Sequence, residues 1–141
     1  MKLMLAVDGS ACSDRAVAEV VATFGVWREE PEVHLLYVHP PIPIGRVQHH
    51  IGHDSLDNYY REESLPHLAS AEAALNAAGI AYTRHIHVGD PAELVVSVAA
   101  DLACGWIVMG NQGRAAVVDA VLGSVAHRAL RLAHCPVLLV K

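Results

Sequence analysis

Lysine is nearly absent from this sequence of 141 residues, and the position of the two lysines excludes two kinds of site. They are Lys2 and Lys141, so no lysine follows a glycine-rich loop in the interior of the chain. The G-x-x-x-x-G-K-[ST] phosphate loop needs a lysine there, and a Schiff-base enzyme needs an interior lysine amine. A phosphate site in this chain therefore has to use backbone N–H groups, hydroxyls and arginine.

Cysteine is also scarce. Cys12, Cys104 and Cys135 are odd in number and widely spaced, and no C-x-x-C pair occurs. The pattern indicates neither a disulfide framework nor a thiolate metal site. We expect buried, unreactive thiols.

Long apolar runs are missing. The longest, Leu3 to Val7, has five residues, whereas a membrane-spanning helix needs about 20. Asp8 interrupts this segment, so no secretory signal is visible. We expect a cytoplasmic protein that does not interact with a membrane.

Positive charge is sparse, with 10 Lys and Arg against 15 Asp and Glu and a formal net charge of -5. Binding to nucleic acid needs several basic residues together, so we expect no nucleic-acid partner. The hydrophobic content of 53% indicates a compact fold, and the length fits one domain over residues 1–141.

Short apolar runs alternate with helical periodicity along the chain. The runs are typical of parallel strands buried on both faces, and they are Leu3 to Val7, Leu35 to Val38, Trp106 to Met109 and Val137 to Val140. Three amphipathic stripes predict helices: Val17, Val20, Val21 and Phe24; Val95, Val98, Ala99 and Leu102; and Ala126, Ala129, Leu130 and Ala133.

Two more elements complete the alternation. A helix is expected from about Tyr60 to Ala78, stopped by Gly79, although Pro66 leaves its first turns open. The alternating segment from Tyr82 to Val88 predicts an edge strand. The sequence thus predicts an α/β fold, a doubly wound, Rossmann-like, five-stranded parallel sheet with helices on both faces. A long loop is expected at about residues 40–58, where no periodicity is sustained.

Four residues near the C-terminus, Gly110, Gly113, Gly123 and Ser124, stand where a strand should lead into a helix. Glycine lets the backbone approach an anion without a Cβ in the way, and the first N–H groups of a helix are unpaired donors. The spacing therefore predicts a cradle for phosphate. On their own, the same glycines also fit a tight turn that binds nothing.

The end of the first strand is the second candidate region. A carboxylate at Asp8 can accept hydrogen bonds from a nucleoside, but Asp8 or Ser10 can equally cap the following helix. Val38 and His39 end the second strand, and ligands in such sheets bind beyond the carboxyl ends of the strands. The three regions are expected to converge.

The spacing G-x2-G-x9-G-[ST], met by Gly110, Gly113, Gly123 and Ser124, resembles the ATP-binding signature of the universal stress protein family. The resemblance extends to Ala6-Val7-Asp8-Gly9-Ser10, Val88-Gly89-Asp90-Pro91, Val108-Met109-Gly110 and Ala133-His134-Cys135-Pro136-Val137. It covers nearly the whole chain except residues 41–58, and it implies the fold of the adenine nucleotide alpha hydrolases.

The resemblance also implies a ligand, ATP with Mg²⁺, and a set of residues around it. Those near the adenine and ribose would be Ala6, Val7, Asp8, Ser10 and Val38. Those near the ribose and phosphates would be Met109, Gly110, Gln112, Gly113, Arg114, Gly123, Ser124, Val125 and Ala126. Asn111 and Gln112 depart from the family pattern, which often has a hydroxyl and a basic residue there. Arg114 either compensates as a phosphate donor or is simply solvated.

Members of this family commonly form homodimers through the last strand, here Val137 to Val140. The apolar stretch from Arg114 to Leu122 is expected to pack on the sheet or on a second subunit. His49, His50 and His53 have a spacing that zinc or nickel can use, but a solvated cluster is the favoured interpretation.

The function that the resemblance implies is that of an ATP-binding regulatory module in a stress response. No G-x-S-x-G turn occurs, and nothing identifies a nucleophile for His39 to activate, so we assign no catalytic residue. Two alternatives stay open: a weak ATPase or autophosphorylating protein, and a nucleotide-free dimeric interaction protein.

Overall fold

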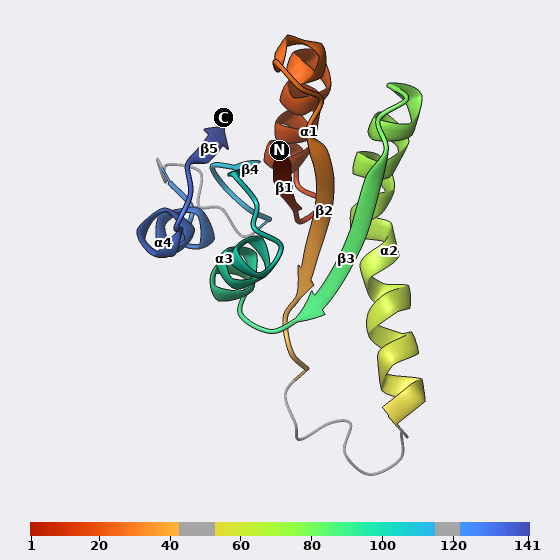
Figure 1. Ribbon diagram of the computed structural model, residues 1–141. Helices are drawn as coiled ribbons and strands as arrows, with labels where there is room; N and C mark the ends of the chain where they lie inside the picture. Colours follow the sequence, from red (N-terminus) through yellow and green to blue (C-terminus); the bar gives the residue numbers. More distant parts are fainter. Residues whose placement is uncertain (43–52, 115–121) are drawn as a thin grey trace.

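The computed structural model describes residues 1–42, 53–114 and 122–141 (Figure 1). Five strands form one parallel sheet in the order β3-β2-β1-β4-β5. Their bounds are β1 Lys2–Val7, β2 Glu32–His39, β3 Tyr82–Val88, β4 Trp106–Gly110 and β5 Val137–Val140. The expected doubly wound, Rossmann-like sheet is confirmed, and β3 lies at its edge as predicted.

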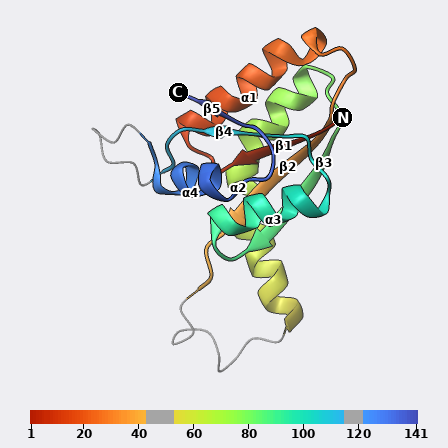
Figure 2. The same ribbon diagram turned by 60° about the vertical axis from the view of Figure 1, so that its left-hand side comes forward.

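Helices cover both faces of the sheet. They are α1 Ala11–Thr23, α2 His53–Ala77, α3 Pro91–Asp101 and α4 Ser124–Leu132, with a short 3-10 turn at Phe24–Val26. Figure 1 and Figure 2 show α3 and α4 on one face, and α1 and α2 on the other. Each pair of helices closes its own apolar core against the sheet.

The central strand β1 supplies both cores. Leu3 and Leu5 are fully buried beneath α1 and α2, while Met4 is fully buried on the side of α3. This alternation explains the continuous apolar run, because a strand with helices on both faces has no polar side. The register with β2 and β4 is regular along the strand.

The expected loop at 40–58 and the start of the following helix were partly wrong. α2 begins at His53, so residues 53–58 are helical, and residues 43–52 lie outside the described part of the chain. Pro66 lies inside the helix, where it removes the donor to the carbonyl of Glu62. Both residues are exposed, so water can satisfy that carbonyl, and the helix continues.

Two smaller expectations were also partly wrong. Leu130, expected on the buried stripe of α4, is 43% exposed, whereas Ala126 and Ala129 are buried as expected. Of the three cysteines only Cys104 is buried, and Cys12 and Cys135 are half-buried. The stop at Gly79 is confirmed, with a φ of 70° that favours glycine.

Candidate functional site

A cavity of about 300 Å³ lies at the carboxyl ends of β1, β2 and β4, on the side of the sheet covered by α3 and α4. This is the place where ligands bind in doubly wound sheets. Its lining consists of Ala6, Val7, Asp8, Ser13, Leu36, Val38, Pro40, Pro91, Val95, Met109, Gly110, Gln112, Gly113, Arg114, Gly123, Ser124, Val125 and Ala126. The structure thus brings together all the residues that the resemblance placed around a nucleotide except Ser10.

Ser10 caps helix α1 instead of lining the cavity. Its hydroxyl accepts a hydrogen bond from the N–H of Ser13 at 3.2 Å, as expected of an N-cap. Ser13, which the sequence analysis did not single out, is buried and lines the cavity, and its hydroxyl donates to the carbonyl of Ser10 at 2.9 Å. No local sequence signal distinguished these two serines.

Asp8 connects two of the loops that line the cavity. One carboxylate oxygen accepts from the N–H of Ser10 at 2.9 Å, and the other accepts from the N–H of Arg114 at 3.1 Å. The loop after β1 is thereby tied to the loop after β4. Asp8 therefore shapes the turn after β1 and stands at the cavity wall, while Ser10 is the helix cap. Hydrogen bonding of Asp8 to a nucleoside stays a prediction.

The glycines have packing roles of their own. A Cβ on Gly110 would lie 2.8 Å from the backbone carbon of Cys12 in α1, and one on Gly113 would lie 2.8 Å from Asp8 Oδ2. Side chains at these positions would clash with the protein itself. The glycines thus have a structural role whether or not a ligand binds, and the phosphate cradle stays a prediction.

The start of α4 is the part of the site best suited to an anion. Gly123 is the N-cap of α4 and has no side chain that could accept a hydrogen bond. The first N–H groups of the helix therefore receive no acceptor from the N-cap residue. Ser124, Val125 and Ala126 line the cavity there. The N–H of Gly123 itself is not available, because it donates to the carbonyl of Asn111 at 2.8 Å.

Arg114 turns its guanidinium toward α2. Its Nη1 lies 2.9 Å from His67 Nε2 and 3.3 Å from His67 Nδ1. The His67 ring stacks on Tyr37, with centroids 5.1 Å apart and planes at 18°. Burial, followed by the charge of Arg114, lowers the pKa of His67 below its ordinary value. His67 carried no signal in the sequence.

His39 does not line the cavity. Its Nδ1 lies 2.6 Å from the carbonyl oxygen of Pro40, and its ring packs edge-on against Tyr37 and Tyr60. At the end of β2, the residues that line the cavity are Val38 and Pro40. The structure thus gives no support to His39 as a general base at the ligand.

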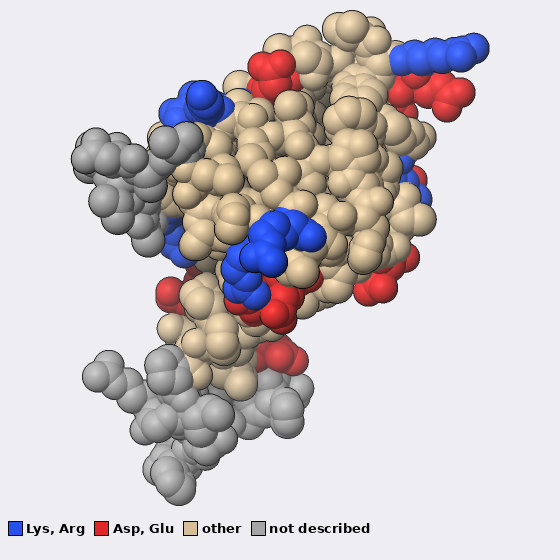
Figure 3. All heavy atoms as spheres, turned by 90° about the vertical axis from the view of Figure 1, so that its left-hand side faces the viewer, with Lys and Arg blue, Asp and Glu red and all other residues tan. Residues whose placement is uncertain are grey.

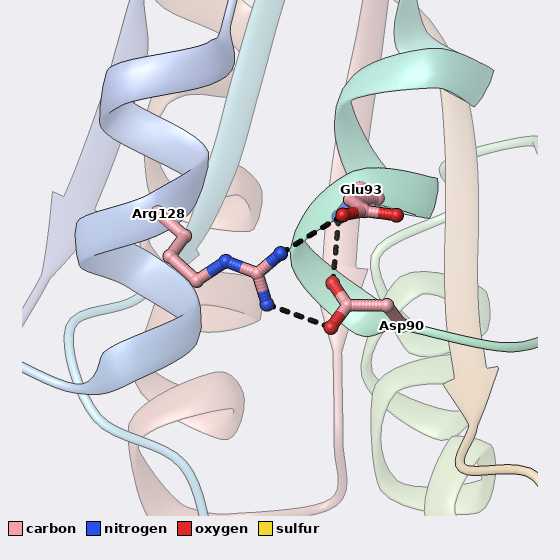
Figure 4. Close-up of polar contacts among 3 residues, drawn as sticks. All are labelled: Asp90, Glu93 and Arg128. Atoms are coloured by element: carbon pink, nitrogen blue, oxygen red, sulfur yellow. Dashed lines mark hydrogen bonds and ion pairs between the residues drawn. The ribbon is translucent and has the colours of Figure 1, made fainter.

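Arg128 joins the two helices that form one wall of the site (Figure 4). Its Nη1 lies 2.7 Å from Asp90 Oδ2, and its Nη2 lies 3.0 Å from Glu93 Oε1. Asp90 also caps α3 by accepting from the N–H of Glu93 at 3.0 Å. That backbone bond, with Arg128, lowers the pKa of Asp90. The bridge fixes the start of α3 relative to α4, and the sequence analysis did not foresee it.

Several sequence features lie away from the cavity or outside the described residues. His49 and His50 fall in the undescribed segment, and only the backbone of His53 is described. Within the described ranges, no group of three His, Cys, Asp or Glu side chains is arranged to hold a metal ion.

None of the described helices is long and apolar enough to cross a bilayer. Figure 3 shows few Lys and Arg side chains on the face it presents, and they stand apart.

The model of the universal stress protein family matches residues 1–141. The chain belongs to this family. A universal stress protein of Thermus aquaticus is 31% identical over 99% of this chain and 97% of its own length. The resemblance noted from the glycine spacing is thus confirmed, and it extends through residues 41–58.

Solved structures agree with this assignment. The structure of MJ0577 from Methanocaldococcus jannaschii is 28% identical, has a TM-score of 0.83, and matches over 99% of this chain and 94% of that one. A universal stress protein solved in complex with cAMP is 24% identical, with a TM-score of 0.72 over 100% of this chain and 97% of that one. Two further neighbours, 18% and 22% identical, carry AMP and dAMP. Adenine nucleotides are therefore ligands of proteins with this fold.

Proposed function

We propose that this universal stress protein binds an adenine nucleotide in the cavity and acts as a nucleotide-dependent regulatory module in a stress response. ATP with Mg²⁺ is the form that the glycine signature favours. The single observation that carries the proposal is the convergence of the signature residues, from three strand ends and α4, on one cavity. The neighbours that bind cAMP, AMP and dAMP support the same ligand class.

The chemistry of the lining suits the two ends of a nucleotide. Apolar side chains of Leu36, Val38 and Val95 offer walls for the flat adenine ring. The start of α4, with the Ser124 hydroxyl, offers donors for a phosphate. Mg²⁺ would be held mainly by the phosphates, with Asp8 as the one carboxylate that the described lining offers.

Binding without rapid turnover is the expected behaviour. Hydrolysis needs a base that can activate water, and Asp8 is the one carboxylate among the described lining residues. Its two oxygens already accept the N–H groups of Ser10 and Arg114, and none of the described lining residues is a histidine or a second carboxylate that could take its place. Nucleotide retained through purification, identified by mass spectrometry, tests this: ATP supports a binding module, and ADP supports a slow hydrolase.

A charge placed at Ser124 tests the site itself. The Ser124→Asp variant puts a carboxylate at the first turn of α4, where the helix dipole tolerates or favours it, so the fold should keep its thermal midpoint. The same carboxylate repels phosphate. Calorimetric titration with Mg-ATP should show affinity at least about tenfold lower than that of the wild type, equivalent to about 1.4 kcal/mol.

The matched control is Ser124→Asn, which is neutral and also an accepted residue near helix starts. It should keep ATP affinity within about threefold of the wild type. Equal ATP affinity in Ser124→Asp and the wild type would mean that the phosphates do not bind at the start of α4. Absence of ATP binding in the wild type would refute the proposed function.

A further inference from the structure

His67 packs against β2 and the loop after β1, on the side of the sheet opposite the cavity. One face of its ring stacks on the buried Tyr37 of β2. The backbone of Gly9 abuts it from the loop after β1, so closely that a Cβ on Gly9 would lie 3.0 Å from His67 Nδ1. The ring is half-buried, and it touches the same loop that carries Asp8.

Arg114 is held at its backbone and engaged at its tip. Its N–H donates to Asp8, so the backbone is anchored at Arg114 itself, and the side chain is the part that can swing. Its Nη1 lies 2.9 Å from Nε2 and 3.3 Å from Nδ1 of His67, so it stands over the face of the ring and not in the plane of its lone pairs. The guanidinium also interacts with the side chain of Tyr37. A neutral ring can hold a cation on its face, whereas a protonated ring repels it.

Charged and titratable groups surround the ring on every side. Arg114 and Asp8 face it from the two loops, Tyr37 and His39 from β2, and Glu63 from its own helix α2. Burial and the nearby cations favour the neutral ring, while the two carboxylates oppose this. Protonation would place a second positive charge against Arg114, and the contact would be lost.

We propose that His67 is the positioning residue of Arg114: the neutral ring holds the guanidinium on the α2 side, and the protonated ring releases it to a nucleotide phosphate in the cavity. This inference rests on the proposed function, because it concerns the same site. Arg114 lines the cavity and is a cation within reach of a ligand there, so its release supplies a charge-assisted donor that Asn111 and Gln112 do not.

The expected consequence is linkage between phosphate binding and proton uptake. A bound phosphate removes the guanidinium from His67, and the ring then binds a proton more readily. Affinity for the phosphate should therefore rise as the pH falls. Cyclic AMP is the suitable probe, because its phosphodiester carries the same single charge throughout the range in which histidine titrates.

The test is calorimetric titration of cyclic AMP at about pH 8 and at about pH 5.5, on either side of the ordinary histidine pKa. In the wild type the Kd should fall by about fivefold at the lower pH, within the tenfold per unit that one linked proton allows. In His67→Gln, whose amide oxygen can accept from Arg114 but cannot titrate, the Kd should change by less than about twofold.

Two controls separate this role from others. His39→Gln alters a neighbouring histidine with no contact to Arg114 recorded in the structure, and it should keep most of the wild-type response. Adenosine, which lacks the phosphate, should bind wild-type protein equally at both pH values. In the wild type, the ring pKa of His67 measured by NMR should rise when cyclic AMP is added, a readout that does not depend on the folding of any variant.

The outcomes distinguish the two proposals. A pH response that survives in His67→Gln, or a His67 pKa that cyclic AMP leaves unchanged, overturns the role of His67 while leaving nucleotide binding intact. Failure of cyclic AMP, adenosine and ATP to bind at either pH overturns the proposed function, and the role of His67 with it.

Discussion

Single residues at this site serve the fold and the ligand together, and the glycines show it most clearly. Gly110 ends β4 where α1 crosses it, and a Cβ there would lie 2.8 Å from both the backbone carbon and the Cβ of Cys12. Helix α1 could accept the methyl group only by moving. Gly110 is thus needed for the close packing of α1 on β4 whether or not phosphate binds.

Gly110→Ala is accordingly expected to destabilise the protein even without nucleotide. Overpacking of this kind costs about 1–3 kcal/mol, measured as the change in the free energy of unfolding in urea. The control is Gly25→Ala, because a Cβ on Gly25 meets nothing within 4 Å, and it should stay within about 0.5 kcal/mol of the wild type. Equal stability of Gly110→Ala and the wild type would show that α1 can move away from β4 at little cost in free energy.

Contacts between residues that are far apart in the sequence were not predicted. Arg114 was named from the family resemblance, whereas His67 lies in the middle of a long helix, 47 residues away along the chain. Arg128 lies on α4, whereas its partners, Asp90 and Glu93, lie at the start of another helix. Such pairs depend on how two loops or two helices are placed, which no local pattern encodes.

At the scale of elements, the strands buried on both faces were predicted best, because such burial requires apolar residues. The runs at β1, β2 and β4 were therefore recognisable. β5 is apolar as well, although it lies at an edge and its residues are only partly buried or exposed. Helix boundaries were harder to predict. α2 begins at His53, more than three turns before Pro66, in a mostly polar stretch. No apolar periodicity therefore marked the start of this helix.

β5 is the element whose role the fold leaves most open. It forms an edge of the sheet beside β4, and Leu138 on it is 40% exposed. An edge strand with an exposed leucine is a ready surface for pairing with a second copy, and we propose that the protein forms a homodimer through β5, as the family resemblance implies.

Leu138→Glu should then shift the molar mass measured by light scattering from that of a dimer toward that of a monomer, because the dimer would bury the new charge. Leu132→Glu is the matched control: Leu132 is similarly exposed, at 44%, but lies on α4, and its variant should stay dimeric. A wild-type protein that is strictly monomeric at high concentration would contradict the dimer.

At the scale of the whole molecule, histidines set the expected response to acid. Burial, with the neighbouring histidines, lowers the pKa of His85 below the ordinary 6.5, and the pKa of His67 is lowered as well. The unfolded chain therefore binds more protons than the folded one as the pH falls through about 6.5, and the stability that these neutral rings contribute is lost on that descent.

The free energy of unfolding should accordingly decrease between about pH 7.5 and about pH 5.5. In His85→Gln, which keeps a polar partner for His34, that decrease should be smaller than in the wild type. His134→Gln, at an exposed position, should leave the decrease unchanged. A pH profile identical in the wild type and His85→Gln would exclude His85 as a contributor.

The central claim is that an adenine nucleotide occupies the cavity between the strand ends and α4. Amide chemical shifts recorded by NMR during titration with Mg-ATP test it most directly. The largest changes are predicted at Ser124, Val125 and Ala126 and at the ends of β1 and β2, all of which lie at the cavity. Absence of saturable changes, or changes centred on the exposed side of α2, would contradict the claim.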